Sequence, residues 1–318
     1  MSCPARRPFG RELPTLAGCA LAGWPQRALS HAAASPPGGA QAIAWSFDVS
    51  VVALLALSIA FYAAGALRLH PHSRLGRRMR GLQAAAFAAG WLVVVAALVS
   101  PLDALGASLF SAHMLQHELL MIVAAPLLVL GRPLSVWLWA FPAPARQRIA
   151  RMVRAPAFSA TWTGLTRPGV VWVLHAAALW AWHAPALFES ALHHPRVHTA
   201  QHWSFLVTAL LFWWTALGHG RASSTRSAHG LLLLFTTMMH TSALGALLTL
   251  APGVWYPSYI ASSTALGFDP LEDQQLGGLV MWVPGALAYV LGGLAVAARW
   301  LMQREPPGRA GRLLARQP

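Results

Sequence analysis

Residues 83–102 read QAAAFAAGWLVVVAALVSPL, a stretch without a charged side chain. A helix of this length crosses the roughly 30 Å hydrocarbon core of a lipid bilayer. Inside lipid the backbone has to satisfy its hydrogen bonds internally, so only helices and closed barrels span membranes. The run is continuous and does not alternate apolar with polar residues, so it predicts a transmembrane helix rather than a barrel strand.

Similar apolar runs recur on both sides of this stretch. The chain has 56% hydrophobic and only 10% charged residues, whereas a soluble domain has about a quarter charged residues. We therefore expect an all-α fold, a polytopic membrane helical bundle with about seven transmembrane helices. The predicted spans are residues 49–67, 83–102, 109–130, 168–191, 197–218, 229–251 and 275–300.

The two ends of the chain differ from this bundle. Residues 1–47 are rich in Pro, Gly and Ala and predict a mostly disordered extension, residues 48–300 predict the membrane domain, and residues 301–318 predict a basic cytoplasmic tail. The only cysteines, Cys3 and Cys19, lie in the extension and form no CxxC pair. This usage argues against a thiolate metal site and against a disulfide framework.

The positive charge is concentrated in particular loops. The net charge is +14, and all 23 basic residues are arginines. Loops 68–80 and 131–167 hold five and six of them, and the tail from Arg299 holds five, whereas loops 103–108 and 252–274 hold none. Cytoplasmic loops carry the arginine excess in membrane proteins, so we expect the N-terminus outside and the C-terminus in the cytoplasm. This distribution fits orientation in a membrane better than a nucleic-acid surface.

The segment 134–154 combines aromatic and basic residues between two predicted spans. This mixture is typical of a helix lying in the membrane interface. The alternative is an ordinary loop broken by prolines 142 and 144, which is an equally good reading of its first half. The residues concerned are Trp137, Trp139, Phe141, Arg146, Arg148, Arg151 and Arg154.

Histidines gather near the predicted outer ends of several spans. Ionisable residues are rare inside membrane spans, where they indicate function by default. His113 and His117 are four residues apart, as are His198 and His202, and this spacing puts each pair on one helix face. At about 1.5 Å per residue, His117, His183 and His202 fall within roughly 10 Å of the outer boundary and can meet in one layer.

These residue types indicate a metal site. Imidazole binds copper, zinc and iron well, and thioether sulfur favours Cu(I). One pair of histidines is a weak signal, but two pairs with two further histidines on one side favour a metal over satisfied interfacial side chains. The methionines can equally serve as packing. The predicted ligands are His113, His117, His183, His198, His202, His240, Met238 and Met239.

Four acidic residues accompany the histidines. Glu118 follows His117 directly, and three more acids lie in the predicted outer loop. Acids at a low-dielectric mouth attract cations by focusing the field, although an acidic loop alone is more often a solvated surface. The predicted accessory acids are Glu118, Asp269, Glu272 and Asp273.

The same strings resemble the CtaG-type cytochrome c oxidase assembly factors. The resemblance rests on HMLQHE at 113–118, APLL at 125–128, GRP at 131–133, WHAPALF at 182–188, HTAQH at 198–202, FWW at 212–214, DPLEDQQLGG at 269–278 and MWVPG at 281–285. The matches keep the same order from about residue 45 to residue 300, and the N-terminal extension is not covered.

The resemblance implies a bacterial plasma-membrane protein needed to mature a haem-copper oxidase. Its expected cargo is copper, as Cu(I), and its expected partners are oxidase subunits and a periplasmic copper chaperone. By this likeness the positions at stake are the segment 269–275 and His113, His117, His183, His198 and His202.

Three functions remain open on the sequence. The first is a non-enzymatic copper-handling factor that takes copper at the outer face and passes it on by ligand exchange. The second is a seven-span zinc-dependent membrane hydrolase in which an acid such as Glu118 activates water. The third is a b-type cytochrome with haem between histidines of facing helices.

Overall fold

The computed structural model describes residues 45–69, 76–217 and 224–304, and every regular element in these ranges is a helix. The predicted all-α class is confirmed for this part of the chain. The N-terminal extension, apart from residues 45–47, lies outside the described residues, as does the tail from residue 305. The last helix, α14 (Pro270–Arg304), takes in residues 301–304, which the sequence assigned to the tail.

Five helical stretches are long and apolar enough to cross a membrane. They are α1 (Val49–Leu69), α2 (Arg77–Leu98), the continuous run Phe110–Gly131, Ser227–Thr249 of α12 (Ser224–Thr249), and Pro270–Met302 of α14. The chain is therefore a multi-pass membrane protein. The run Phe110–Gly131 consists of α4 (Phe110–Glu118), a π-helical segment η2 (Leu119–Ala124) and α5 (Ala125–Gly131).

Two further predicted spans are helical but differ from the expectation. Residues 168–191 form α9 (Pro168–His183) and α10 (Pro185–His193), which pass the same length and hydropathy test only together and are bent by 74° at their junction. Pro185 explains the break, because it cannot continue the hydrogen bonding of α9. Helix α11 (Pro195–Leu217) is not among the helices apolar enough to cross a membrane, since His198, Gln201 and His202 lower its hydropathy.

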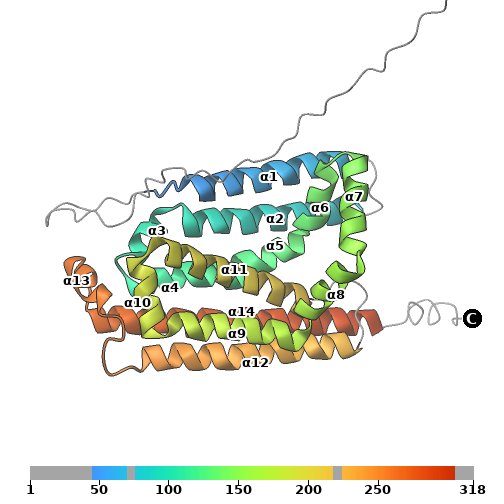
Figure 1. Ribbon diagram of the computed structural model, residues 1–318. Coiled ribbons are helices and arrows are strands. Elements are labelled where there is room, and N and C mark those ends of the chain that lie inside the picture. The colour runs from blue at the N-terminus through green and yellow to red at the C-terminus, as the bar shows by residue number, and fades with distance from the viewer. Residues whose placement is uncertain (1–44, 70–75, 218–223, 305–318) are drawn as a thin grey trace, which may run out of the picture. The chain divides into compact units, whose positions relative to one another are not determined.

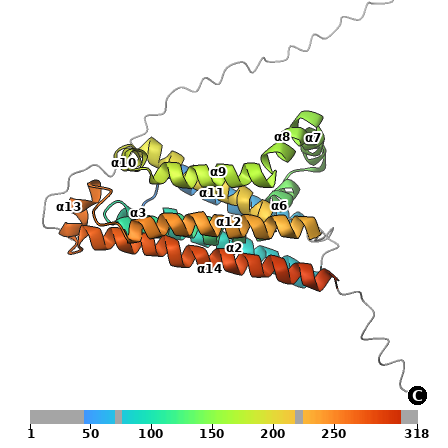
Figure 2. The same cartoon turned by 90° about the horizontal axis from the view of Figure 1, so that it is seen from below.

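The long helices lie side by side and define two ends of the bundle (Figures 1 and 2). At one end lie α4, α10 and the short helices α3 (Pro101–Gly106) and α13 (Ser258–Ala265). At the other end lie α7 (Ala143–Arg154) and α8 (Pro156–Leu165). Helix α4, which carries His113 and His117, thus lies at the opposite end of the bundle from the arginine-rich helix α7.

Segment 134–154 does not form one interfacial helix. It divides at Phe141 and Pro142 into α6 (Pro133–Ala140) and α7. Helix α6 packs closely on α1: Val136 is buried, and its carbonyl lies against Gly65, where any side chain would collide with it. The interfacial prediction therefore applies only to α7, and the loop alternative is wrong for α6.

The π-helical segment explains how the chain tolerates a proline within a span. Pro126 cannot donate a backbone hydrogen bond and its ring disfavours the preceding turn. The wider turns of η2 end at Ala124, two residues before it. The carbonyl of Met121, inside η2, accepts a hydrogen bond of 2.9 Å from the buried indole Nε1 of Trp213 in α11. This bond joins the segment to the centre of the bundle.

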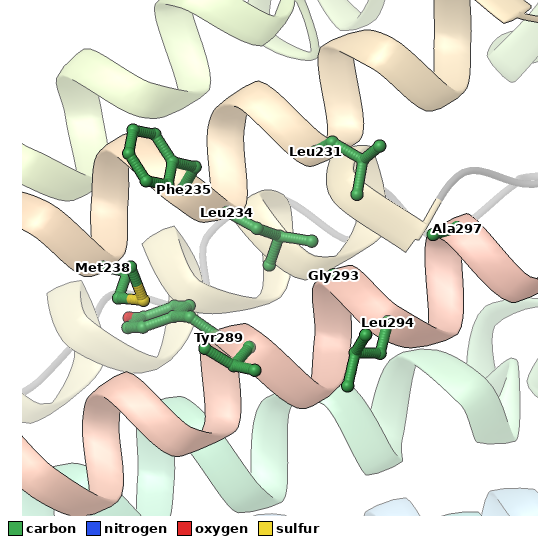
Figure 3. A pocket seen from close by; sticks show the side chains of 9 residues that line it. Leu231, Leu234, Phe235, Met238, Tyr289, Gly293, Leu294 and Ala297 are labelled. Atoms are coloured by element: carbon green, nitrogen blue, oxygen red, sulfur yellow. The ribbon is translucent and has the colours of Figure 1, made fainter.

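Helices α12 and α14 approach each other at glycines. A Cβ atom on Gly278 would lie 2.6 Å from the backbone nitrogen of Thr249 and 2.7 Å from the carbonyl oxygen of Gly245. Farther along the same pair lies an apolar groove of about 300 Å³ (Figure 3). Its lining includes Met238 and Tyr289, and the sulfur of Met238 lies beside the Tyr289 ring in Figure 3.

Candidate metal centre

Helix α4 carries the first histidine pair into the protein interior. His113 and His117 are both 1% exposed, and their rings meet edge to face with centroids 4.3 Å apart. The helix is held from two sides. Its Gln116 donates hydrogen bonds of 2.7 Å to the Ala97 carbonyl and 2.9 Å to Oδ1 of Asp103. These bonds fix the rotation of α4, so that both imidazoles face α11.

Asp273 caps the N-terminus of α4 from the start of α14. Its Oδ2 accepts a hydrogen bond of 2.7 Å from the backbone nitrogen of Phe110, and its Oδ1 accepts 3.1 Å and 2.5 Å bonds from the nitrogen and hydroxyl of Ser111. A carboxylate here satisfies amides that lack helical partners and complements the helix dipole. Asp273 therefore serves α4 as a cap rather than standing in a solvated acidic mouth.

Helix α11 supplies the second pair. The rings of His198 and His202 lie 4.2 Å apart, and His113 lies 5.3 Å and 6.0 Å from them. One nitrogen from each of these three histidines lies within 4.8 Å of the other two. In a tetrahedral site with metal–nitrogen bonds of about 2.0 Å, the ligand nitrogens are about 3.3 Å apart. Small side-chain rotations would therefore bring the three nitrogens to the spacing of a metal site.

His117 and His183 adjoin this trio. His117 lies 5.1 Å from His202, measured between ring centroids. His183, the last residue of α9, is 2% exposed and lies 6.1 Å from the ring of Phe205, which also contacts His117. The structure therefore brings together all five predicted histidines of α4, α9 and α11, with three of them at ligand spacing.

Hydrogen bonds to Nδ1 fix the tautomer of two of the five. Nδ1 of His113 lies 3.3 Å from the Gly106 carbonyl and 3.1 Å from the Tyr259 hydroxyl, which itself donates to the Gly106 carbonyl at 2.8 Å. Both neighbours can therefore act only as acceptors, and Nδ1 carries the proton. His183 Nδ1 donates likewise to the Leu179 carbonyl at 2.7 Å. In both residues Nε2 keeps its lone pair, which is the arrangement of a metal ligand.

Several ring nitrogens of the cluster have no protein partner. Buried polar groups are almost always hydrogen-bonded, and exceptions indicate a missing ion, ligand or water. Among the described residues, the buried and unpartnered atoms include Nε2 of His113, His117, His183 and His202, and Nδ1 of His117. An all-imidazole donor set fits copper or zinc.

Tyr259 and Gln201 are site residues that sequence reasoning missed. Burial and the nearby Asp273 raise the pKa of Tyr259, so its phenol keeps the proton that it donates to Gly106. Gln201 is fully buried beside the α11 histidines, and neither of its amide atoms has a hydrogen-bond partner. The sequence holds a signal for Tyr259, since two of only four tyrosines lie in the loop 252–269.

The other predicted ligands lie elsewhere on α12. His240 contacts Trp172 and Trp180 of α9, with 3.4 Å between the Trp180 Nε1 and its own Nδ1. Met239 is 54% exposed on the outside of the bundle, and Met238 lines the apolar groove of Figure 3. The structure therefore does not bring these three residues to the histidine trio.

The remaining acids do not line the cluster either. Glu118 is buried and its Oε2 lies near Gly285 of α14, away from α11. Asp269 is exposed and its Oδ1 caps α14 through the nitrogens of Leu271 and Glu272, at 2.9 Å and 3.0 Å, and Glu272 is exposed on the first turn of α14. Asp269 and Glu272 thus lie at the end of the bundle where the cluster is.

Comparisons with known proteins find a family match and several curated relatives. Residues 60–303 match the family of cytochrome c oxidase caa3 assembly factors, Caa3_CtaG. An uncharacterized protein of Mycobacterium bovis and one of Mycobacterium tuberculosis are each 28% identical over 275 residues, and one of Mycobacterium leprae is 23% identical over 269 residues. Each alignment covers 81% of this chain and 40% of the relative, so the chain spans about 40% of the length of these curated relatives. No solved structure matches.

The family match extends from within α1 to the end of α14 and therefore includes the histidine cluster, its Asp273 cap and the Tyr259 contact. With more than two thirds of its residues inside that match, this chain belongs to the cytochrome c oxidase caa3 assembly factor family, CtaG.

Proposed function

We propose that this chain serves oxidase assembly by binding copper, as Cu(I), in the histidine cluster and delivering it to a haem-copper cytochrome c oxidase. The observation that carries the proposal is the set of buried, unpartnered imidazole nitrogens on His113, His117, His183 and His202, beside the ligand spacing of His113, His198 and His202. Copper is cargo here, so the site has to release it as well as hold it. Neutral imidazoles suit this task, because ligand exchange can proceed one histidine at a time.

The proposed setting is the bacterial plasma membrane. We count α9–α10 and α11 as one span each, which makes seven spans. The arginine distribution supports an N-terminus outside and a C-terminus in the cytoplasm. In this orientation the cluster lies toward the outer face. His198, which is only partly buried, then forms the outer edge of the cluster, where a periplasmic copper chaperone would hand over its ion.

The geometry favours copper handling over the two other functions. In a zinc hydrolase an acid has to reach the metal-bound water, but Glu118 lies toward Gly285 on the other side of α4. In a b-type cytochrome a porphyrin has to fit between two histidines. The ring centroids of His113, His117 and His202 lie 4.3 to 6.0 Å apart. These rings are therefore packed together and do not face each other across a porphyrin.

Elemental analysis of purified protein after anaerobic Cu(I) loading tests the proposal. We expect copper in the wild type and its loss in a His113→Ala/His202→Ala double variant. His175→Ala is the matched control, because His175 is equally buried but bonds to the Thr208 hydroxyl outside the cluster. Equal copper in the double variant and the wild type would refute the site, and stoichiometric zinc without copper would favour the hydrolase.

A second test addresses delivery in the cell. Under limiting copper, cells with the double variant should accumulate the oxidase polypeptide but show reduced oxidase activity, and added copper should restore part of it. Normal oxidase activity in those cells would show that oxidase assembly does not depend on the histidine cluster. A Soret band in the purified protein would support the cytochrome instead.

A further inference from the structure

Helix α7 lies across the bundle rather than along it. It runs roughly perpendicular to the long helices in Figure 1, and Figure 2 shows it nearly end-on. None of its residues is buried. A helix in this direction lies parallel to the membrane plane when the long helices cross the bilayer, so its faces are offered to the membrane surface and to water rather than to the protein core.

The residues of α7 divide into two faces. Arg148, Arg151 and Arg154 follow one another at intervals of three and are all exposed. At about 100° per residue they share one side of the helix. Ile149 and Val153 occupy the opposite side, and Met152 lies between Ile149 and Arg148. Met152 and Val153 are 69% and 48% exposed. An exposed apolar face opposite an arginine face is the pattern of a helix that lies in the headgroup region.

The connections of α7 hold it at the bilayer boundary. Two residues separate it from α6, which packs on the span α1, and one residue separates it from α8. Helix α8 leads within two residues into α9, the first half of the bent span. Phe158, Trp162 and Leu165 expose a second apolar stripe on α8. The short connections to α6 and α9 therefore hold the α7–α8 pair at the membrane surface.

The charge around α7 has one sign. No acidic residue occurs between Glu118 and Glu189, whereas six arginines do, namely Arg132, Arg146, Arg148, Arg151, Arg154 and Arg167. Arg146 lies 4.0 Å over the ring of Trp139, so it stacks on the protein. Arg148, Arg151 and Arg154 are exposed and can therefore contact an anionic surface.

We propose that α7 is a binding surface for anionic phospholipid headgroups. The phosphates would pair with Arg148, Arg151 and Arg154, and Met152 and Val153 would insert among the first acyl carbons. Guanidinium groups bind phosphate with two parallel hydrogen bonds. The apolar face favours lipid over an acidic protein partner, because lipid satisfies both faces of α7 at once. This surface is independent of the histidine cluster at the other end of the bundle.

Spin-labelled lipids provide the test. Full-length protein is reconstituted in phosphatidylcholine vesicles containing phosphatidylglycerol, and the relative association of labelled phosphatidylglycerol is measured by electron paramagnetic resonance. Each arginine near the surface contributes roughly fivefold to anionic-lipid attraction. We expect the preference to fall severalfold in R148Q/R151Q/R154Q and to persist in R148K/R151K/R154K, which keeps the charge. An unchanged preference in the glutamine variant would overturn the proposal.

A second measurement locates the helix. With Cys3 and Cys19 replaced by serine, single spin labels are placed through Val153→Cys on the apolar face and Gln147→Cys on the arginine face. The label at 153 should be accessible to oxygen and protected from a water-soluble nickel reagent, and the label at 147 should show the reverse. Equal exposure of both labels to the nickel reagent would overturn the proposal in favour of an acidic protein partner.

Discussion

The hydroxyl of Tyr259 lies 3.1 Å from Nδ1 of His113, although 146 residues separate them in the chain. Because this hydroxyl gives its proton to Gly106, its oxygen is left as an acceptor for the imidazole proton. The loop between α12 and α14 thereby decides which nitrogen of His113 is open toward α11. Tyr259 thus positions the His113 ring of the trio through Nδ1 and leaves Nε2 open.

Tyr259→Phe should therefore weaken copper binding while the protein still folds. Groups that orient a metal-binding histidine are typically worth about 10- to 100-fold in affinity. Competition with a Cu(I) chelator measures the change. Tyr256→Phe is the control, since its hydroxyl bonds at 2.8 Å to the backbone carbonyl of His183 and leaves the ring nitrogens untouched. Equal losses in both variants would point to general destabilisation of the outer loop.

Asp273→Ala should destabilise α4 at its N-terminus. Loss of a capping side chain costs about 1 kcal/mol, and the cost should be at the upper end of the usual range because three donors lose their acceptor. Thermal unfolding in detergent provides the measurement, with Asp269→Ala as the exposed cap for comparison. We expect the unfolding temperature to fall more for Asp273→Ala than for Asp269→Ala. A smaller fall for Asp273→Ala than for Asp269→Ala would contradict the capping role of Asp273.

Trp213→Phe should loosen the π-helical segment. The substitution removes the donor to the Met121 carbonyl but keeps an aromatic ring in the core. An unsatisfied buried acceptor costs about 1–3 kcal/mol. Hydrogen exchange of the amides in η2 should accelerate relative to those of α2. Unchanged exchange in η2 would show that the indole bond does not hold the segment.

Gly278→Ala should disturb the contact between α12 and α14. Its methyl group would meet backbone atoms of Thr249 and Gly245, which cannot rotate away, and overpacking of this kind costs about 1–3 kcal/mol. Gly164→Ala in α8 is the matched control, because nothing lies within 4 Å of the added carbon. Denaturation of both variants in the same detergent should separate them, with the control as stable as the wild type or more so.

The sequence predicts the helical elements well, because continuous apolar runs have few alternatives in lipid. Five helices are long and apolar enough to span a membrane by themselves, and the bent pair α9–α10 makes a sixth. The seventh predicted span, α11, stays a prediction, because the histidines that build the site make this helix more polar. The proline in WHAPALF at 182–188 carries a sign of the bend between α9 and α10. Its angle depends on the packing of α10 against α11, which a linear sequence does not contain.

For the site, spacing predicts both histidine pairs because four residues return to the same helix face. It does not say which helices face each other, so the ligand set predicted from residue types includes His240, and packing leaves His240 outside the cluster. Asp273 was expected as an accessory acid. In the structure Asp273 caps helix α4. The sequence cannot predict this role, because it depends on contact between residues 110 and 273.

The π-helical segment also sets an angular register. A π-helical turn holds about one residue more than an α-helical turn, and one residue corresponds to about 100° of rotation around a helix axis. Deleting a single residue from 119–124 would leave a plausible uninterrupted apolar helix. It would turn His113 and His117 by about that angle relative to α5, away from His198 and His202. The cluster thus depends on the length of a segment that contributes none of its histidines.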